Sequence, residues 1–308
     1  PLNLFTNNTT RMTIASSGNV GIGCTPSSIW SSSYDALQIG LGGSISAHDG
    51  AGHALKIGSN FVYEGTAPNY YDKYLTTSTA GKYEQDNDGH KWFTAASGTA
   101  GNAISWQERF RIASDGSLST PTAGTSNVRF GVNAGNSIAS GGNYNVVVGD
   151  EAGTAITTGD ENTFIGYQSG DSNTTARYNT AVGKGSLSST TTGESNVAIG
   201  RDALLSNTTG PSNTAVGKSA LVQNTTGRDN TAVGFSAAAT NTTGVENVAM
   251  GMYALRFNTT GGSNTALGYL ALHRNTTASN NTAVGRYALE ANTTGTRNIA
   301  IGTSALDA

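Results

Sequence analysis

Metal chemistry would be carried by one short acidic segment and by one pair of histidines. Residues 86–90 read Asp-Asn-Asp-Gly-His, with oxygen ligands on alternate residues as at the start of a calcium-binding loop. The complete loop needs a glutamate at its twelfth position, where this chain has Ser97. His48 and His53 flank a glycine-rich segment, but zinc sites usually show tighter paired spacing and a second pair of ligands. We interpret 86–90 as a solvated turn and the histidine segment as a loop, and we predict neither a metal nor a cofactor.

Familiar catalytic motifs are missing from the sequence. It contains neither a Gly-x-Ser-x-Gly nucleophile elbow nor the full Gly-x-x-x-x-Gly-Lys-Ser/Thr pattern of a phosphate-binding loop. Glycoside cleavage needs two carboxyl groups within about 5 to 10 Å of each other, whereas the second half of the chain carries scattered acids such as Asp202, Glu246 and Glu290. We predict that the chain has no catalytic residues and is not an enzyme. A tailspike depolymerase is kept as an alternative, because acids from successive repeats could approach each other in the fold.

Aromatic side chains gather between residues 30 and 110, a region that holds all three tryptophans of the chain. Because aromatic faces stack on sugars, we take Tyr70, Tyr71, Tyr74 and Trp92 as candidate contacts with a receptor. A hydrophobic core is the alternative use for most of them.

The second half of the chain is built from a 17-residue repeat that runs from residue 145 to residue 308. Each copy opens with a five-residue cassette from Asn to Gly, in which the fourth residue is apolar and of medium size and the third is alanine in eight of ten copies. A fixed period of this kind predicts a solenoid. The cassette asparagines are Asn145, Asn162, Asn179, Asn196, Asn213, Asn230, Asn247, Asn264, Asn281 and Asn298.

One unit, 213–229, shows the role of each position. The run Thr-Ala-Val suits a short strand, and the glycine after it allows a corner. The small-then-large pair Ala-Leu at 220–221 indicates a second inward-facing strand, and Asn-Thr-Thr-Gly indicates the turn back. We therefore predict one coil of two short strands per unit, with ladders of asparagine amides along the stack. The positions that define the repeat are Asn213, Val216, Gly217, Leu221, Asn224 and Gly227.

A single coil offers little apolar burial against the entropy cost of ordering its residues. We therefore expect each coil to bury a second face against another chain. The alanine at the third cassette position, opposite Thr214 and Val216, would let that chain approach closely.

Threonines recur at the second cassette position and raise the alternative of ice binding, which needs a flat face of matched hydroxyl groups. The row is interrupted by Val197 and Val248. Thr214 also shares a face with Val216, and we expect that face to be buried. An ice-binding solenoid is therefore kept only as a lesser alternative.

The composition argues against several classes of partner. A formal charge of −3 gives no reason to expect nucleic acid as a partner. The sequence has no run of 18 apolar residues, so we predict no membrane insertion. Cys24 is the only cysteine, which excludes a disulfide within the chain, and we expect it to be a packed, inert thiol.

The cassette, as in Asn-Thr-Ala-Val-Gly at 213–217, resembles the head repeat of trimeric autotransporter adhesins, whose strands read like Ser-Val-Ala-Ile-Gly, and the same repeat in phage tail fibres. That family forms a left-handed parallel β-roll with three chains around one axis, and its usual period is shorter than 17. The resemblance implies that the chain forms a homotrimer.

A second resemblance lies near the N-terminus. Residues 11–23 read Arg-Met-Thr-Ile-Ala-Ser-Ser-Gly-Asn-Val-Gly-Ile-Gly, whose alternation predicts a β-hairpin, and a related version follows at 111–118. Both resemble a signature of phage tail-fibre and other virion structural proteins. We expect a β-hairpin connector at 1–29, an aromatic-rich all-β domain of packed sheets at 30–118, a linker with a capping coil at 119–144, and the β-roll at 145–308.

Together the two resemblances imply a structural and host-attachment segment of a trimeric phage tail fibre or a similar virion appendage. The expected partners are further copies of the chain, other virion tail proteins, and a polysaccharide or protein of the host surface. The head of a bacterial trimeric adhesin is the alternative. In either case we expect the chain to be a piece of a longer polypeptide.

Overall fold

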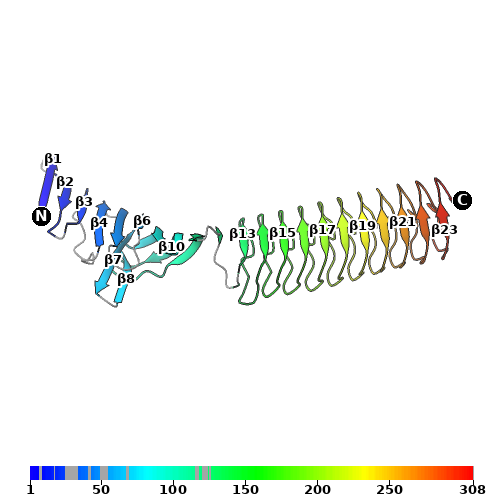
Figure 1. Ribbon diagram of the computed structural model, residues 1–308, viewed down its shortest axis with the longest axis horizontal. Helices are drawn as coiled ribbons and strands as arrows, with labels where there is room; N and C mark the ends of the chain where they lie inside the picture. The colour runs from blue at the N-terminus through cyan, green and yellow to red at the C-terminus, as the bar shows by residue number, and fades with distance from the viewer. Residues whose placement is uncertain are drawn as a thin grey trace. The chain divides into compact units, whose positions relative to one another are not determined.

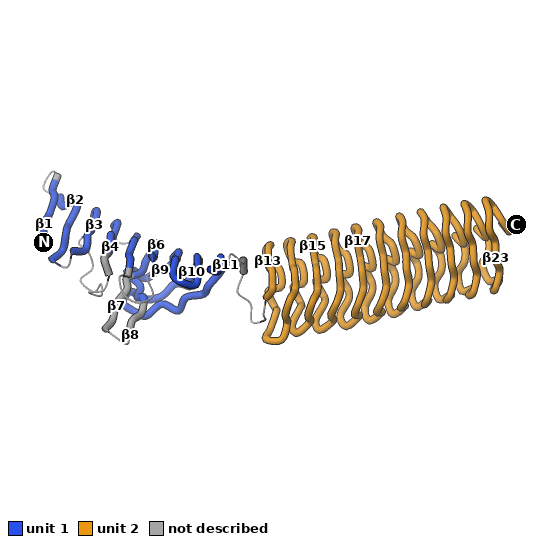
Figure 2. Tube along the Cα trace, viewed as in Figure 1, with its two compact units in different colours: residues 1–121 blue, residues 122–308 orange. Residues whose placement is uncertain are grey.

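The computed structural model of the chain describes residues 1–6, 9–16, 18–24, 34–40, 43–48, 55–66, 69–114, 118–119, 124 and 126–307. The described residues form 23 strands and no helix, so the predicted all-β class is confirmed. The chain divides into two compact units, residues 1–121 and residues 122–308 (Figure 2). This boundary lies within the predicted linker at 119–144.

Unit 1 contains a ten-stranded sheet and a separate two-stranded hairpin (Figure 1). Neighbouring strands of the large sheet are antiparallel, except for the parallel pair β3 and β4. In spatial order the strands are β1 (Leu2–Thr6), β2 (Thr9–Ile14), β3 (Val20–Ile22), β4 (Tyr34–Ile39), β5 (Gly43–His48), β6 (Leu55–Ser59), β9 (Ser78–Asp86), β10 (Gly89–Gly98), β11 (Gln107–Ala113) and β12 (Leu118–Ser119). The hairpin consists of β7 (Phe61–Thr66) and β8 (Asn69–Tyr74) and forms a second layer against part of the sheet.

Both predicted hairpins are confirmed. Met12 lies opposite Ile22 in the β2–β3 pair, and Ile112 lies opposite Leu118 in the β11–β12 pair. The pairing of β3 with β4 joins the predicted connector at 1–29 to the predicted domain at 30–118, so the two share one sheet.

Unit 2 is a parallel solenoid whose eleven strands stack in sequence order (Figure 1). Strand residues pair with the residues 17 positions later, as predicted from the repeat. The first step, from β13 to β14, is 18 residues, and β13 lies in the segment predicted to hold the capping coil. The strands are β13 (Val128–Phe130), β14 (Val146–Val148), β15 (Thr163–Ile165), β16 (Thr180–Val182), β17 (Val197–Ile199), β18 (Thr214–Val216), β19 (Thr231–Val233), β20 (Val248–Met250), β21 (Thr265–Leu267), β22 (Thr282–Val284) and β23 (Ile299–Ile301).

The prediction of a second strand in each coil was wrong. Ala220 and Leu221 are both fully buried, but successive side chains of a strand point to opposite sides. Two adjacent inward side chains therefore need another backbone, and Leu221 takes a left-handed φ of 50°. The segment still bonds along the stack, because the N–H of Leu221 donates to the carbonyl of Ala237 at 3.0 Å.

The predicted orientation of the strand was also wrong. Ala215 is fully buried in the core of its own coil, together with Ala220 and Leu221. Thr214 and Val216 are half-buried and point outward. The alanine row therefore packs against the Ala-Leu segment of the same chain, because the large Leu side chain fills the space opposite the alanine.

Buried asparagines form two ladders along the stack, as predicted. In the first, the backbone N–H and Nδ2 of Asn213 both donate to Oδ1 of Asn196, at 2.9 and 3.2 Å. In the second, Nδ2 of Asn224 donates to Oδ1 of Asn207 at 2.8 Å. The carbonyl of Gly227 ties the ladders together, because it accepts from Nδ2 of both Asn213 and Asn224.

The glycine that ends each cassette is required by the close approach of neighbouring coils. Gly217 has a φ of 132°, and a Cβ atom there would lie 2.5 Å from the carbonyl oxygen of Gly234. That separation is well below van der Waals contact, so the predicted corner needs glycine.

Candidate binding surfaces

The four predicted receptor contacts do not lie together on one surface. Tyr70 and Tyr71 belong to β8, and their side chains lie outside the described part of the structure. Tyr74 is buried with Ala80 and Ala95, and its hydroxyl donates to the carbonyl of Ala96. It serves the core of unit 1, the alternative use considered above.

Trp92 is the predicted contact whose described side chain is accessible. It belongs to β10 and is 38% exposed, on the opposite face of the sheet from Ala95, since side chains alternate along a strand. Its ring packs between Tyr83 and Phe110, with centroid distances of 5.2 and 5.3 Å. The prediction that Trp92 binds a receptor stays a prediction.

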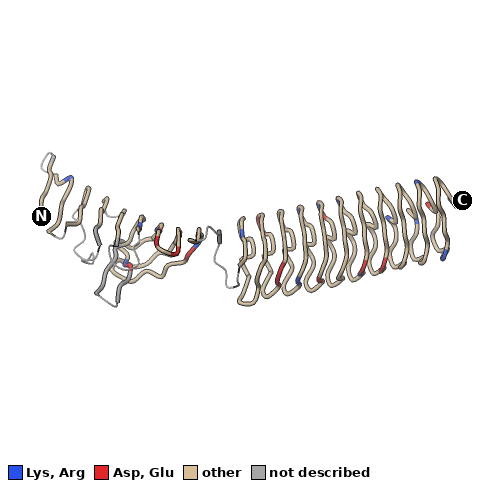
Figure 3. The backbone as a smooth tube through the Cα atoms, viewed as in Figure 1, with Lys and Arg blue, Asp and Glu red and all other residues tan. Residues whose placement is uncertain are grey.

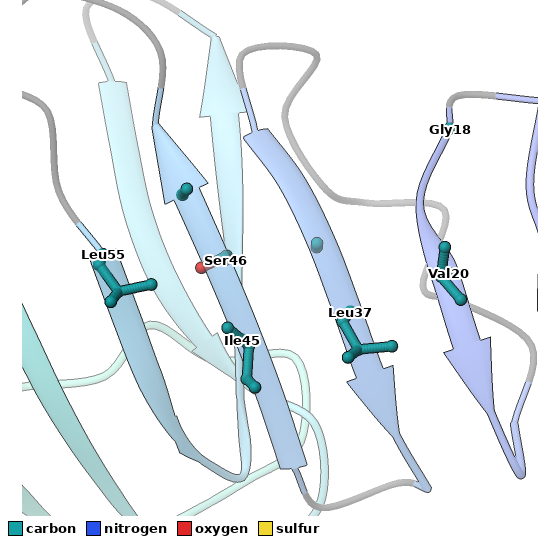
Figure 4. A pocket seen from close by; sticks show the side chains of 8 residues that line it. Gly18, Val20, Leu37, Ile45, Ser46 and Leu55 are labelled. Atoms are coloured by element: carbon teal, nitrogen blue, oxygen red, sulfur yellow. The ribbon is translucent and has the colours of Figure 1, made fainter.

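Two shallow hollows occur on the same face of the sheet as Trp92. One, of about 460 Å³, is lined by side chains that include Ile57, Tyr83, Trp92 and Arg109. The other, of about 340 Å³, is lined by Val20, Leu37, Ile45 and Leu55 from four neighbouring strands (Figure 4). The walls of both are mainly apolar, which favours contact with an apolar surface.

A buried ionic cluster lies on the other face of the sheet, under the β7–β8 hairpin. Asp72 accepts hydrogen bonds from Lys56 at 3.4 Å, from Lys82 at 2.9 Å and from Nε1 of Trp106 at 2.6 Å. Lys82 also pairs with Glu84 at 2.7 Å. Burial lowers the pKa of Lys56, and the attraction of Asp72 opposes that effect.

No pattern in the sequence predicts this cluster. Lys56 and Lys82 lie on strands that alternate as expected, but alternation does not show which face becomes buried. The three side chains that meet at Asp72 come from separate segments of the chain. Since Asp72 and both lysines are buried and Trp106 is partly buried, we assign the cluster a structural role, in which it ties β8 to β6 and β9.

The acidic segment at 86–90 forms the turn between β9 and β10, as interpreted from the sequence. Nζ of Lys91 donates to Asp86 at 2.8 Å and to Asp88 at 3.2 Å, so one ammonium group offsets part of the negative charge of the two carboxylates. Burial is the largest single effect and would raise the pKa of Asp86, but the hydrogen bonds from Lys91 and from the backbone N–H of Asp88, with the positive charges of Lys91 and Arg111, together outweigh it, and the pKa is lowered.

Histidine and acidic side chains gather in no group of three or more that could hold a metal within the described ranges. The histidine segment predicted to be a loop lies outside them, because His53 and the side chain of His48 are not described.

The three acids of unit 2 named from the sequence each lie beside a group that is not a carboxylate. Asp202 pairs with Arg201 at 2.9 Å, Glu246 accepts from Ser263 at 3.0 Å, and Glu290 lies 3.9 Å from Nδ1 of His273. Charged residues are sparse along the solenoid (Figure 3). These contacts account for the three isolated acids, and we assign no catalytic role to them.

The residue after each cassette glycine belongs to a row that includes aromatic rings and cations in neighbouring coils. Lys184 lies over the ring of Tyr167 and Lys218 over the ring of Phe235, with Nζ 5.6 Å from the centroid in both cases. Such contacts stabilise exposed side chains by about 0.5–1 kcal/mol each. The row therefore stabilises one corner of the stack by contacts between successive coils.

No helix in the described residues is long and apolar enough to cross a membrane. Comparison with protein-family models, with curated proteins and with solved structures found no match. The proposals below therefore depend on the sequence patterns and on the geometry of the chain.

Proposed function

We propose that the chain is a structural and host-attachment segment of a homotrimeric phage tail fibre or a similar virion appendage. The observation that carries the proposal is the uninterrupted parallel stack of unit 2. Its eleven strands, at about 4.8 Å per step, make a body on the order of 50 Å long. Amide ladders and backbone bonds join each coil to the next, so the stack can hold two ends of an appendage apart without a hinge.

The resemblance of residues 11–23 to a virion structural signature supports the same proposal. In this role the partners are two further copies of the chain, other virion tail proteins, and a polysaccharide or protein of the host surface. Trp92, which is 38% exposed in the single chain, could contact the host only where further copies of the chain leave it uncovered. The chain acts by assembly and adhesion without catalysis, on the outside of the virion, and binds neither nucleic acid nor a bilayer.

The native mass of the purified chain tests the proposal. Light scattering should give three times the chain mass of 31.4 kDa, about 94 kDa. A stable species of 31.4 kDa would overturn the homotrimer. The head of a bacterial trimeric adhesin shares the expected roll and the expected mass. It is distinguished by a secretion signal and a membrane anchor encoded in the same gene.

One observation favours a second candidate, an ice-binding solenoid. The threonines of the second cassette position, such as Thr214 and Thr231, point outward on the flat parallel sheet, contrary to the expectation that this face is buried. Val197 and Val248 still interrupt the row. Measuring the gap between the melting and freezing temperatures of ice in a dilute solution of the protein tests this candidate. The absence of such a gap would exclude an ice-binding function.

A further inference from the structure

One face of the large sheet of unit 1 carries a continuous row of apolar side chains. Nine strands each contribute one residue, and each residue lies directly opposite the next across the strand pairs. We call this row the apolar ladder. Its members are Leu2, Ile14, Val20, Leu37, Ile45, Ile57, Tyr83, Trp92 and Phe110.

The ladder face is exposed in the single chain. Ile45 and Ile57, at the centre of the row, are 37% and 43% exposed, and Leu2 at one end is 60% exposed. Residues two positions away on the same face are equally open, with Ile22 at 44% and Ile39 at 50%. The two hollows described above lie on this face and include ladder residues in their walls (Figure 4).

Across β4, β5 and β6 the opposite face of the same sheet is buried and mainly polar. Gln38, Ser44, Ser46 and Lys56 alternate with ladder residues or lie beside them, and each is less than 10% exposed. A sheet that has one face in water normally turns its polar residues toward the water and its apolar residues toward the core. In these central strands the usual polarity is reversed, which indicates that the ladder face is covered when the protein is assembled.

The size of the ladder face is that of an interaction surface. The exposed apolar side chains of this face together present on the order of several hundred Å² of apolar area to solvent. A patch of that size on a soluble protein marks an interaction site. Nine strands at about 4.8 Å spacing make the ladder on the order of 40 Å long. A small ligand would cover only part of such a row.

We infer that the occupant of the ladder face is the same face of further copies of this chain. A second copy supplies an apolar row of equal length, and no member of the row carries a charge that would be buried without a partner. The solenoid, by contrast, already has a closed core of alanine and leucine within one chain. The inference rests on the homotrimer proposed above and places its main contact in unit 1, whereas the sequence had placed it on the alanine row of the coils.

Substitution of one central ladder residue tests the inference. Ile57→Lys puts a charge into the contact and should convert a species of about 94 kDa into one of about 31.4 kDa by light scattering. The matched control is Ile199→Lys, which changes an equally exposed strand residue, 40% against 43%, on the outer face of unit 2. The control should keep the mass of the unmodified chain. Far-UV circular dichroism checks that both variants keep their strands.

A labelling experiment tests the same contact without disrupting it. In a Cys24→Ser background, Ile57→Cys should react with a maleimide at least tenfold more slowly than Ile199→Cys in the assembled protein, and at the same rate in denaturant. Equal rates in the assembled protein would overturn the inference.

The outcomes distinguish failure of the ladder contact from failure of the proposed homotrimer. If the unmodified chain is a trimer and Ile57→Lys stays a trimer, the ladder is not the contact, yet the trimeric fibre stands. If the unmodified chain is a monomer, both fail at once.

Discussion

The asparagine at the start of each coil uses its whole hydrogen-bonding capacity inside the stack. In Asn213 the amide donates to Asn196 and to Gly227, while Oδ1 accepts from the backbone N–H and the Nδ2 of Asn230. A side-chain amide supplies two donors and two acceptor lone pairs. Aspartate lacks the donors, and serine is too short to reach both neighbouring coils, so the position demands asparagine.

We expect Asn213→Ala to lower the free energy of unfolding of unit 2 by about 3 to 5 kcal/mol. The change removes four buried hydrogen bonds, to Asn196, Gly227 and Asn230, each contributing about 1 kcal/mol, and leaves the backbone N–H of Asn230 unsatisfied at a cost of about 1–3 kcal/mol. Urea unfolding followed by circular dichroism measures the loss. The control is the adjacent, outward-facing Thr214→Ala, which should stay within about 0.5 kcal/mol. If both variants lost the same free energy of unfolding, the asparagine ladder would contribute no more to stability than an exposed side chain does.

The ring of His273 makes the stability of unit 2 dependent on pH. Burial lowers its pKa below the ordinary value of 6.5, the carboxylate of Glu290 raises it, and Arg256 and Arg274 lower it further. Both ring nitrogens are buried without a hydrogen-bond partner, and the ring packs against Phe257. The unfolded chain therefore takes up a proton more readily than the folded chain, and stability is lost as pH falls below 6.5.

The corresponding experiment compares the unmodified chain with His273→Phe. The urea midpoint of the unmodified chain should fall between pH 7.5 and pH 5.5, and the variant should show a smaller fall over the same interval. The two proteins share every other titratable group. Parallel pH profiles would mean that the His273 ring does not change its protonation between the folded and unfolded states.

At the scale of the element, the β7–β8 hairpin is fastened to the sheet by charges. Asp72 on β8 is the acceptor for Lys56 on β6 and Lys82 on β9. Removing one member of a buried ionic group is costly because the others keep their charge without compensation. The hairpin should therefore detach when Asp72 is neutralised, although the strands of the sheet keep their own pairing.

We expect Asp72→Asn to destabilise unit 1 by about 3–5 kcal/mol. Fluorescence of Trp106, whose Nε1 bonds to Asp72, reports the local change. Asp202→Asn is the matched control, because that carboxylate pairs with Arg201 at the surface of unit 2. Surface pairs contribute about 0–1 kcal/mol, so a control loss as large as that of Asp72→Asn would contradict the buried-cluster explanation.

The strands could be predicted from sequence because their signals are local. The period of 17 set the register of β14 to β23, and the alternation around the turn at residues 15–19 set that of β2 and β3. The period also shows that Thr214 and Val216 share a face. The period does not show whether that face is buried. Burial depends on the residue that fills the other side of the coil, which here is Leu221 with its left-handed backbone.

The candidate surfaces were harder to predict for the same reason. Tyr74 and Trp92 are both aromatic residues on strands, and only the packing of the hairpin shows that Tyr74 is buried and Trp92 is open. The apolar ladder likewise exists only once the register of nine strands is known. Single residues such as Ile45 or Ile57 look like ordinary core positions in the sequence.

At the scale of the whole molecule, unit 2 behaves as a one-dimensional array. Each coil bonds to the coil before it and the coil after it, as when Leu204 donates to Ala220 and Leu221 donates to Ala237. In such an array stability is the sum of coil and interface contributions. One whole coil can then be removed without loss of register, since the coils on either side of it present the same partners.

Deletion of residues 213–229 removes one coil and joins Ser212 to Asn230, which restores the cassette context found at every other step. We expect the melting temperature to change by less than about 5 °C, because only one interface of ten is lost and its neighbours re-form the same ladder. Deletion of residues 219–222 is the control. It removes fewer residues but takes away the buried Ala-Leu pair and four backbone hydrogen bonds along the stack. A loss of about 5 kcal/mol there should lower the melting temperature by on the order of 10 °C or more. If the 17-residue deletion proved the more damaging of the two, the coils could not be independent modules, and the fit of successive coils would have to depend on the particular sequence at each step.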